Sequence, residues 1–324
     1  MIKMAIKLDK KDRKILSELD MNARASISQI AKKVRLSKEV VNYRIKRLEE
    51  KKIILGYYTV IDTAKLGYMY CRFLLKLQNS TPEKEKEIID YVKKHLSIGW
   101  VVSIEGPWNL VLVIWAKDIN QLKNVTDDIY LKFAKNIQNK AVSIATNVYH
   151  YKNNYLYDKK EDTEWRIETY AQEEIDFTDA KILGLLAKNA RIPLYKIADK
   201  LEITTATARN RIKNLQKRKI LIGFRAMLNT AKLGYQYFKV FLYLENLTKD
   251  KKSKLLTFLR YNPKVIYITE AIGISDLEFE PMAKDILELY DLLNKIKKEF
   301  SDVLRDYTII LNYEVHQINY LPEL

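Results

Sequence analysis

The sequence is poor in several residue types on which particular kinds of protein depend. One cysteine, Cys71, stands among 324 residues, so no intramolecular disulfide can form. With only three histidines besides, we expect no structural zinc site and no cofactor. No run of about 18 apolar residues exists, which argues against a membrane span, and the first nine residues lack the apolar stretch of a signal peptide. These absences predict a soluble, cytoplasmic protein.

Positive charge is abundant and unevenly distributed. The chain has 57 Lys and Arg against 41 Asp and Glu, a net charge of +16. Residues 8–57 hold 14 basic and 7 acidic side chains, and residues 175–224 hold 11 and 4, so each segment carries +7. Nearly all the excess positive charge is therefore concentrated in two segments of equal length.

These two segments belong to an internal repeat. Residues 8–77 align without a gap to residues 175–244, and 28 of the 70 positions are identical. The hexapeptide at 63–68 recurs letter for letter at 230–235. The chain is therefore predicted to be a tandem duplication. The joint at 158–174 has seven acidic and three basic residues and no Gly or Pro, and we expect a solvated acidic linker that is partly helical.

Each basic segment shows the pattern of three short helices. Ser26 and Gln29 have the spacing of a capping box, and Ser37 precedes a run with apolar residues at i, i+4 and i+7. Thr204 holds the place of Ser37 in the second copy. Two short helices with a tight turn predict a helix-turn-helix, and the apolar runs at 53–58 and 220–224 are expected to form a small hairpin wing.

The outer face of the third helix carries the side chains that could reach DNA. Asn and Arg offer the bidentate geometry that recognises adenine and guanine, whereas Lys and Arg near the turn are better placed for phosphates. The predicted DNA-binding residues of the first copy are Lys32, Lys33, Arg35, Ser37, Lys38, Glu39, Asn42, Tyr43, Arg44, Lys46 and Arg47. Those of the second are Lys200, Thr204, Thr205, Thr207, Arg209, Asn210, Arg211, Lys213 and Asn214.

Arg44 and its equivalent Arg211 stand apart from the other members of this set. A helical wheel places both beside the core rather than on the outermost arc. We therefore favour a structural ion pair or a phosphate clamp over base recognition for these two arginines.

The second half of each copy reads as β-α-β-β-α-β, the ferredoxin-like order. A sheet with helices on one face needs cover on the other, and the matching sheet of the second copy is the obvious cover. The predicted fold is thus α+β, with two winged helix-turn-helix and two ferredoxin-like domains in an internal pseudo-dimer. One strand is anomalous, because residues 277–281 (Leu-Glu-Phe-Glu-Pro) are too charged for an ordinary buried strand.

The motifs together resemble the Lrp/AsnC family of transcriptional regulators. The resemblance rests on Asp9, Asp12, the Asn-Ala-Arg at 22–24, the helix at 44–49 and the Leu-Gly at 66–67, and it covers both copies. It implies winged helix-turn-helix domains at residues 1–60 and 175–227, effector domains at 66–157 and 233–324, and double-stranded DNA as partner. It also implies an amino-acid-like effector near a Gly-x-x-Asp turn, matched here by Gly106 with Asn109 and by Gly273 with Asp276.

Three functions remain open. The leading one is a transcription regulator that reads an asymmetric two-part operator, because residues 37–43 differ from residues 204–210 at every position. The second is a sirohaem decarboxylase on the same scaffold, although none of His95, His150 and His316 lies near the glycine turns and no catalytic set is visible, so we expect no enzyme. The third is an architectural protein that coats DNA through charge alone. Trp100, Trp108 and Trp115 are assigned to packing or to contacts with another chain.

Overall fold

The computed structural model describes residues 8–157, 162–168 and 172–321. The α-helices are α1 (Lys10–Asp20), α2 (Ile27–Val34), α3 (Lys38–Glu50), α4 (Pro82–Val92), α5 (Ile119–Lys132), α6 (Phe177–Lys188), α7 (Leu194–Lys200), α8 (Thr205–Lys217), α9 (Lys249–Arg260) and α10 (Ile286–Glu299). The strands are β1 (Ile54–Ile61), β2 (Met69–Leu77), β3 (Ile98–Glu105), β4 (Leu110–Ala116), β5 (Ile137–Tyr151), β6 (Glu164–Glu168), β7 (Leu221–Leu228), β8 (Gln236–Leu244), β9 (Val265–Ile272), β10 (Leu277–Ala283) and β11 (Leu304–Ile318). Short 3-10 turns lie at Ala64–Leu66 (η1), Ala134–Asn136 (η2) and Asn154–Leu156 (η3).

The helices of the two helix-turn-helix units begin at the residues that the caps predict. The Ser26 hydroxyl accepts from the Gln29 amide at 3.2 Å, and the Gln29 side chain accepts from the Ser26 amide at 2.9 Å, so the capping box is confirmed. Ser37 and Thr204 cap α3 and α8 by accepting from the amide three residues ahead. Both copies therefore fold into the predicted sequence of three helices.

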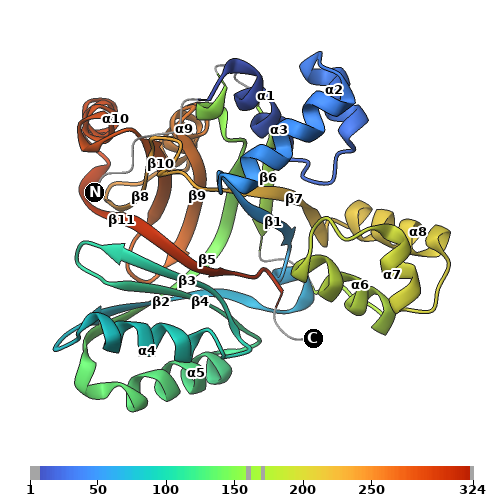
Figure 1. Ribbon diagram of the computed structural model, residues 1–324. Coiled ribbons are helices and arrows are strands. Elements are labelled where there is room, and N and C mark those ends of the chain that lie inside the picture. The colour runs from blue at the N-terminus through green and yellow to red at the C-terminus, as the bar shows by residue number, and fades with distance from the viewer. Residues whose placement is uncertain (1–7, 158–161, 169–171, 322–324) are drawn as a thin grey trace.

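The effector domains follow the predicted β-α-β-β-α-β order, as β2-α4-β3-β4-α5-β5 and β8-α9-β9-β10-α10-β11. The long strand β5 pairs first with β2 of its own copy and then with β9 of the other, and β11 pairs first with β8 and then with β3. Two four-stranded sheets are thereby joined at both edges into a closed ring (Figure 1). This confirms the pseudo-dimer.

Separate apolar clusters hold the ring together. One packs α4 and α5 against the first sheet, and another packs α9 and α10 against the second, so the helices lie on the outer faces. A smaller cluster fills part of the space between the sheets and takes Leu74, Val102 and Val111 from the first copy and Phe241 and Ile310 from the second. The inner faces therefore cover one another, as the pattern of one-sided helices requires.

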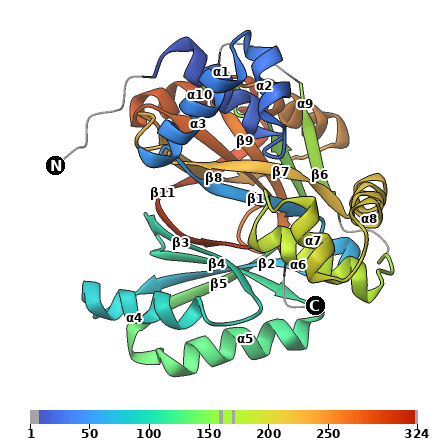
Figure 2. The same ribbon diagram turned by 45° about the vertical axis from the view of Figure 1, so that its right-hand side comes forward.

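The hairpin wing is a wrong prediction. Residues 54–61 form one continuous strand, β1, and it pairs antiparallel with β7 of the other copy, from Ile54 opposite Leu228 to Ile61 opposite Leu221. The run contains no two-residue turn that could close a hairpin within one copy. The wing strands of the two copies therefore pair with each other. Figure 2 shows this two-stranded β1–β7 ribbon between the helix-turn-helix units and the ring.

The linker also differs from the expectation. Residues 164–168 are strand β6, not helix, and pair with β5 from Asn147 to Tyr151. Ile167 is buried, and the ring of Trp165 packs so closely on Gly223 that a Cβ there would lie 2.3 Å from it. These apolar anchors and the free edge of β5 explain the strand. The linker prediction for residues 158–161 and 169–171 lies outside the described residues.

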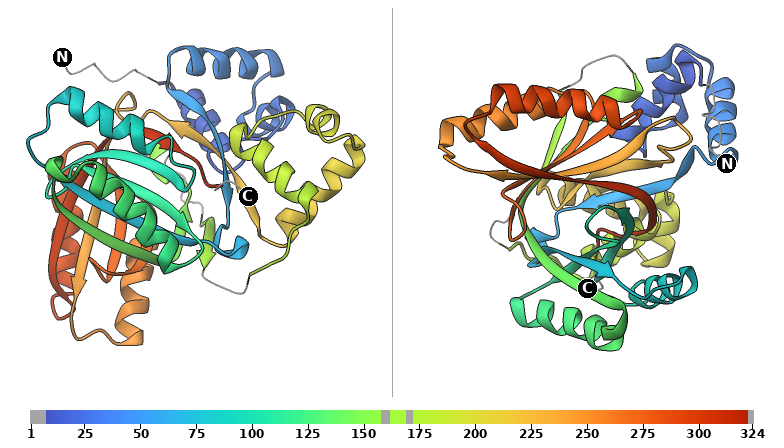
Figure 3. Two further views of the ribbon diagram at one scale, coloured as in Figure 1. Left: turned by 90° about the horizontal axis from the view of Figure 1, so that it is seen from below. Right: turned by 90° about the vertical axis from the view of Figure 1, so that its left-hand side faces the viewer.

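Each helix-turn-helix unit packs against the effector domain of the other copy. The first shares a core with Leu233, Ile266 and Met282, and the second with Val113 and Trp115. The two units lie next to each other on one side of the molecule, away from α4, α5, α9 and α10 (Figure 3). The spacing of the two recognition helices is therefore fixed by contacts that cross between the copies.

Candidate DNA interface and interior cavity

The recognition helices α3 and α8 present their polar faces to solvent. Val41, Ile45 and Leu48 of α3 are buried, as are their equivalents in α8. The exposed members of the predicted set are Lys38, Glu39, Asn42, Tyr43 and Lys46 on α3 and Thr205, Thr207, Arg209, Asn210, Lys213 and Asn214 on α8. These residues could all approach a groove without rearrangement of the core.

The turn before each recognition helix adds cations and capping hydroxyls. Lys32, Arg35 and Lys200 are exposed, and Arg35 ends α2 in the left-handed conformation. Lys33 is exposed and pairs with Glu18 at 2.7 Å. Backbone capping uses the Ser37 and Thr204 side-chain oxygens as acceptors, which leaves the Ser37 hydroxyl proton to donate, whereas the Thr204 hydroxyl also lies 2.8 Å from the Thr207 hydroxyl.

Three arginines are tied to aspartates instead. Arg44 donates to Asp9 at 2.6 Å and to Asp12 at 2.8 Å, and these bonds raise the pKa of Arg44. Arg47 donates to the second oxygen of Asp12 at 2.6 Å. The helical wheel put Arg47 on the outward arc, but its long side chain folds back to α1.

The second copy repeats this arrangement with one guanidinium fewer. Arg211 donates to Asp176 at 2.7 Å and to Asp179 at 2.9 Å. Asn214 stands where the first copy has Arg47. Both pairs join the recognition helix to the first helix of its unit and so set its orientation.

The two glycine turns have a structural role. Gly106 and Gly273 adopt φ of 139° and 129°, and a Cβ on Gly273 would lie 2.5 Å from the carbonyl oxygen of Val142 in the other copy. The Asn109 side chain accepts from the Leu77 amide at 2.9 Å, and Asp276 accepts from the Leu244 amide at 2.8 Å. Asn109 therefore replaces the acid without loss of this backbone contact. The effector-binding role of these residues stays a prediction.

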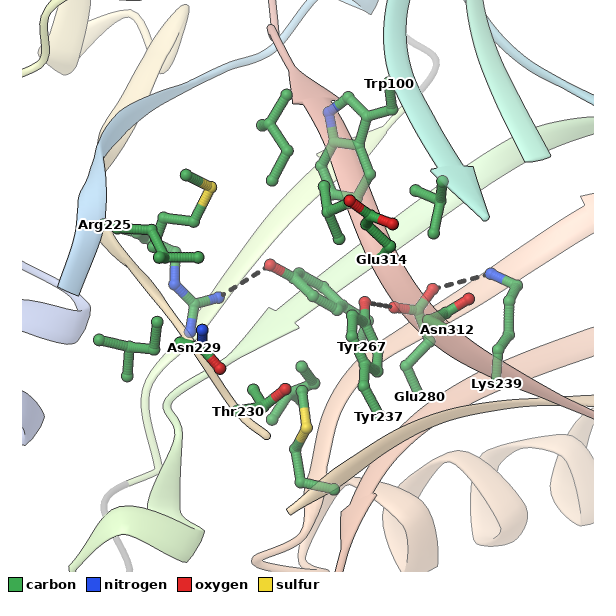
Figure 4. A pocket seen from close by; sticks show the side chains of 18 of the residues that line it. Trp100, Arg225, Asn229, Thr230, Tyr237, Lys239, Tyr267, Glu280, Asn312 and Glu314 are labelled. Atoms are coloured by element: carbon green, nitrogen blue, oxygen red, sulfur yellow. Dashed lines mark hydrogen bonds and ion pairs between the residues drawn. The ribbon is translucent and has the colours of Figure 1, made fainter. Parts of the chain in front are cut away.

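A cavity of about 390 Å³ lies between the two sheets and the β1–β7 ribbon (Figure 4). Its aromatic lining includes Tyr58, Trp100, Tyr237 and Tyr267, and Asn229, Thr230 and Asn312 add polar groups. This cavity could not be recognised from sequence patterns, because its lining residues come from both copies.

A buried charge network spans the gap between the sheets at this cavity. Glu278 of β10, with no exposed surface, pairs with Arg72 of β2 and with Lys239 of β8, the latter at 2.7 Å. Glu280 pairs with Lys239 at 2.8 Å and accepts from Tyr237. Burial by itself would raise the pKa of Glu278, but the charges and hydrogen bonds of Arg72 and Lys239 hold it below its ordinary value. The charged strand is thus a buried one, contrary to the sequence interpretation, because both of its acids are matched by cations.

Equivalent positions of the repeat face each other here but differ in chemistry. Arg72 corresponds to Lys239, whereas Val111 and Val113 correspond to Glu278 and Glu280. Each copy supplies a cation and only the second supplies acids. Acidic residues at alternating positions of a predicted core strand were the signal that could have revealed this network.

Two of the three histidines, His150 and His316, lie in different surroundings. His150 is buried against the rings of Tyr267 and Tyr320, and neither of its ring nitrogens has a hydrogen-bond partner within the described residues. Burial, reinforced by the charge of Arg225, lowers its pKa to about 3. His316 Nε2 lies 2.8 Å from the Ser103 hydroxyl. Across the described ranges, no group of three or more His, Cys, Asp and Glu side chains could hold a metal, and no helix is long and apolar enough to cross a membrane.

Comparison with known proteins matches both DNA-binding units. Residues 8–54 match the winged helix-turn-helix DNA-binding domain, and residues 175–216 match the AsnC-type helix-turn-helix domain. The transcriptional regulator LrpA of Pyrococcus horikoshii is 34% identical over 118 residues, which are 36% of this chain and 82% of LrpA. The regulator Ptr1 of Methanocaldococcus jannaschii is 34% identical over 125 residues, 38% of this chain and 82% of Ptr1.

Among solved structures, the siroheme decarboxylase NirDL has a similar fold along nearly the entire chain. The TM-score is 0.63 at 13% identity, covering 96% of this chain and 94% of NirDL. At that identity the likeness shows the arrangement of the two copies and not a shared activity. The family models match the two DNA-binding units, and the matches to LrpA and Ptr1 each cover 82% of the regulator's own length. The chain belongs to the Lrp/AsnC family of DNA-binding transcription regulators.

Proposed function

We propose that the protein regulates transcription by reading an asymmetric operator whose two halves are recognised by α3 and α8. The observation that carries this proposal is the difference between the two exposed faces. Asn42 and Tyr43 on α3 occupy the positions that Arg209 and Asn210 hold on α8. An arginine there favours guanine and an asparagine favours adenine, so the two helices should select different bases.

The arrangement of the two units supports a single bipartite site. Both recognition helices belong to one chain, lie on the same side of the molecule and are tied by the β1–β7 ribbon. Half-sites separated by about one helical turn, or a multiple of it, are expected from such a pair. A homodimer has two equal helices and prefers palindromes, whereas this chain has two unequal ones.

Selection of random duplex DNA by the purified chain, at low and high salt, tests the proposal. One bipartite, non-palindromic motif that survives high salt is the expected result. Asn42→Ala should relax one half of the motif and Arg209→Ala the other, whereas the phosphate-facing control Lys200→Ala should weaken binding to all sequences alike. A perfectly palindromic motif overturns the proposal, and featureless binding lost at high salt favours the architectural function.

Modulation by an amino-acid-like effector at Gly106 with Asn109 and at Gly273 with Asp276 stays part of this proposal. One oxygen of each side chain already accepts from a backbone amide, so the effector would have to use the second carboxylate oxygen of Asp276, the amide nitrogen of Asn109 or the backbone of the turns. Equilibrium dialysis against labelled amino acids, with and without the selected DNA, tests this.

A sirohaem decarboxylase is the second candidate, favoured by the fold shared with NirDL. The charges argue against it, since Arg72, Lys239 and Arg225 at the cavity are each paired with carboxylates, so the described residues of its lining include no free Lys or Arg for a tetrapyrrole rich in carboxylates. Sirohaem added to the protein would develop a shifted haem absorbance band if this candidate were right. An unchanged spectrum counts against it.

A further inference from the structure

We propose that the cavity between the two sheets binds an uncharged aromatic small molecule that carries a hydrogen-bond-accepting oxygen. The cavity volume of about 390 Å³ falls within the range of small-molecule sites, roughly 300–1,000 Å³. Figure 4 shows the aromatic rings of Trp100 on β3, Tyr237 on β8 and Tyr267 on β9, and Tyr58 on β1 completes the aromatic lining. Such walls fit a planar ring by stacking and edge contacts.

We expect a ligand without net charge because the cationic side chains in the cavity walls are already paired with carboxylates. Arg72 and Lys239 are matched by Glu278 and Glu280. Arg225 is matched by Asp20 at 2.6 Å, with both side chains almost fully buried. In the buried part of the lining, an anion would have to compete with Glu278 or Asp20, and a cation with Arg72 or Arg225, whereas the further lining carboxylate, Glu314, is mostly exposed to solvent. An uncharged ligand leaves all these pairs intact.

We expect the ligand to carry an accepting oxygen because two buried N–H donors in the cavity walls have no hydrogen-bond partner. Six buried side-chain nitrogen or oxygen atoms in the described part of the chain have no hydrogen-bond partner, and three of them belong to residues that line this cavity: Arg72 Nε, Trp100 Nε1 and Asn153 Oδ1. Arg72 and Trp100 both stand opposite Val113 of β4, on its two sides, and so share one row of the first sheet. An acceptor oxygen on a ligand would supply the partner that either of these two donors lacks.

An occupant of this cavity would contact the ribbon that connects the recognition helices. Tyr58 of β1 and the β7 residues 225–228 line the same cavity as both sheets. β1 begins four residues after α3, and β7 begins four residues after α8. Binding should therefore change the affinity for DNA, and this consequence rests on the proposed function, whereas the binding itself does not.

Three probes with one ring system and different charges test the ligand class by calorimetry. Naphthalene-1-carboxamide is uncharged, 1-naphthoate is an anion and 1-naphthylmethylammonium is a cation. We expect the carboxamide to bind the full-length chain with one site per chain and at least tenfold more tightly than either ion. Equal or tighter binding of an ion, or no saturable binding of the carboxamide, overturns the proposal.

Variants locate the site. Trp100→Phe keeps a ring and removes the N–H, and should weaken the carboxamide about fivefold. Val113→Phe should abolish binding by filling the cavity, whereas the control Val40→Phe, at an exposed position on α3, should leave it unchanged. If Val113→Phe does not fold, the Trp100→Phe result decides: unchanged binding contradicts the assignment.

A separate titration with the selected DNA distinguishes the two proposals. Carboxamide binding by a chain that selects no DNA would preserve the cavity site and overturn the proposed function. Sequence-specific DNA binding without carboxamide binding would do the reverse. If both occur and the DNA affinity is the same with and without carboxamide, the coupling through the ribbon is wrong.

Discussion

Arg72 of the first copy forms a buried ion pair with Glu278 of the second, across the gap between the two effector sheets. In the alignment of the two copies, Lys239 is the equivalent of Arg72, and Glu278 is the equivalent of Val111. Two first copies facing each other would bury two arginines and no acid at this point. The two halves of the chain are therefore complementary and not interchangeable, which fits a protein that holds two different recognition helices in one fixed order.

Removal of the shared acid should be costly. Glu278→Gln leaves Arg72 and Lys239 with Glu280 as the remaining carboxylate, and breaking a buried pair in this way costs about 3–5 kcal/mol. Urea unfolding of the chain measures the change. The control Lys254→Met breaks an exposed pair with Asp250 and should have little effect. A Glu278→Gln chain as stable as the control would contradict the assigned role of this network.

The two recognition helices should respond unequally to loss of their buttressing arginine. Arg211→Ala leaves Asp179, which is 7% exposed, without its guanidinium partner and should cost about 1–3 kcal/mol. Arg44→Ala should cost less, since Arg47 still pairs with Asp12. Thermal unfolding of both variants compares them, and a larger loss for Arg44→Ala would show that the ion pairs do not act as the geometry indicates.

His150 should make the protein less stable in mild acid. Its pKa is about 3 in the folded chain and near 6.5 when exposed, so unfolding takes up a proton between these values and stability falls as pH decreases. The slope is about 1.4 kcal/mol per pH unit. Asp62, whose pKa burial raises to about 6, acts in the opposite direction from pH 6 down to about 4.

The difference between the native chain and His150→Gln isolates the histidine, because Asp62 is present in both. Urea unfolding at pH 7, 6 and 5 should show that the native chain loses stability relative to the variant as pH falls. Parallel pH profiles would mean that the pKa of His150 is the same in the folded and the unfolded chain.

The glycine turns should tolerate alanine poorly and unequally. Positive φ costs a non-glycine residue about 1–3 kcal/mol, so both Gly106→Ala and Gly273→Ala should destabilise the chain. Gly273→Ala should cost more, since its Cβ would lie 2.5 Å from a backbone oxygen, against 3.1 Å at Gly106. Unfolding midpoints compare the two, and unchanged midpoints would leave these glycines without the backbone role described above.

Local signals predicted the elements well. The caps at Ser26, Ser37 and Thr204 and the helical period of the apolar residues identified the recognition helices, and the repeat itself predicted the pseudo-dimer. Such features depend on neighbours within a few residues, which the sequence displays directly.

Features that depend on the other copy could not be read in this way. The exchange of β1 and β7, the strand β6 on the free edge of β5 and the buried Glu278 each need a partner more than a hundred residues away or one contributed by the linker. Trp100 was assigned to packing or to contacts with another chain, and only the assembled sheets place its indole and the ring of Tyr267 in the lining of one cavity. Charge in a predicted core strand was the one visible sign of this long-range pairing.

The most direct test of the central claim is competition among three duplexes made from the selected operator. One keeps the two different half-sites, one carries the first half-site twice, and one carries the second half-site twice, with spacing and orientation unchanged. The account predicts that the native chain binds the mixed duplex at least tenfold more tightly than either symmetric one, at a salt concentration that removes nonspecific binding. Equal affinity for a symmetric duplex would contradict it, because the two recognition helices would then be reading the same sequence.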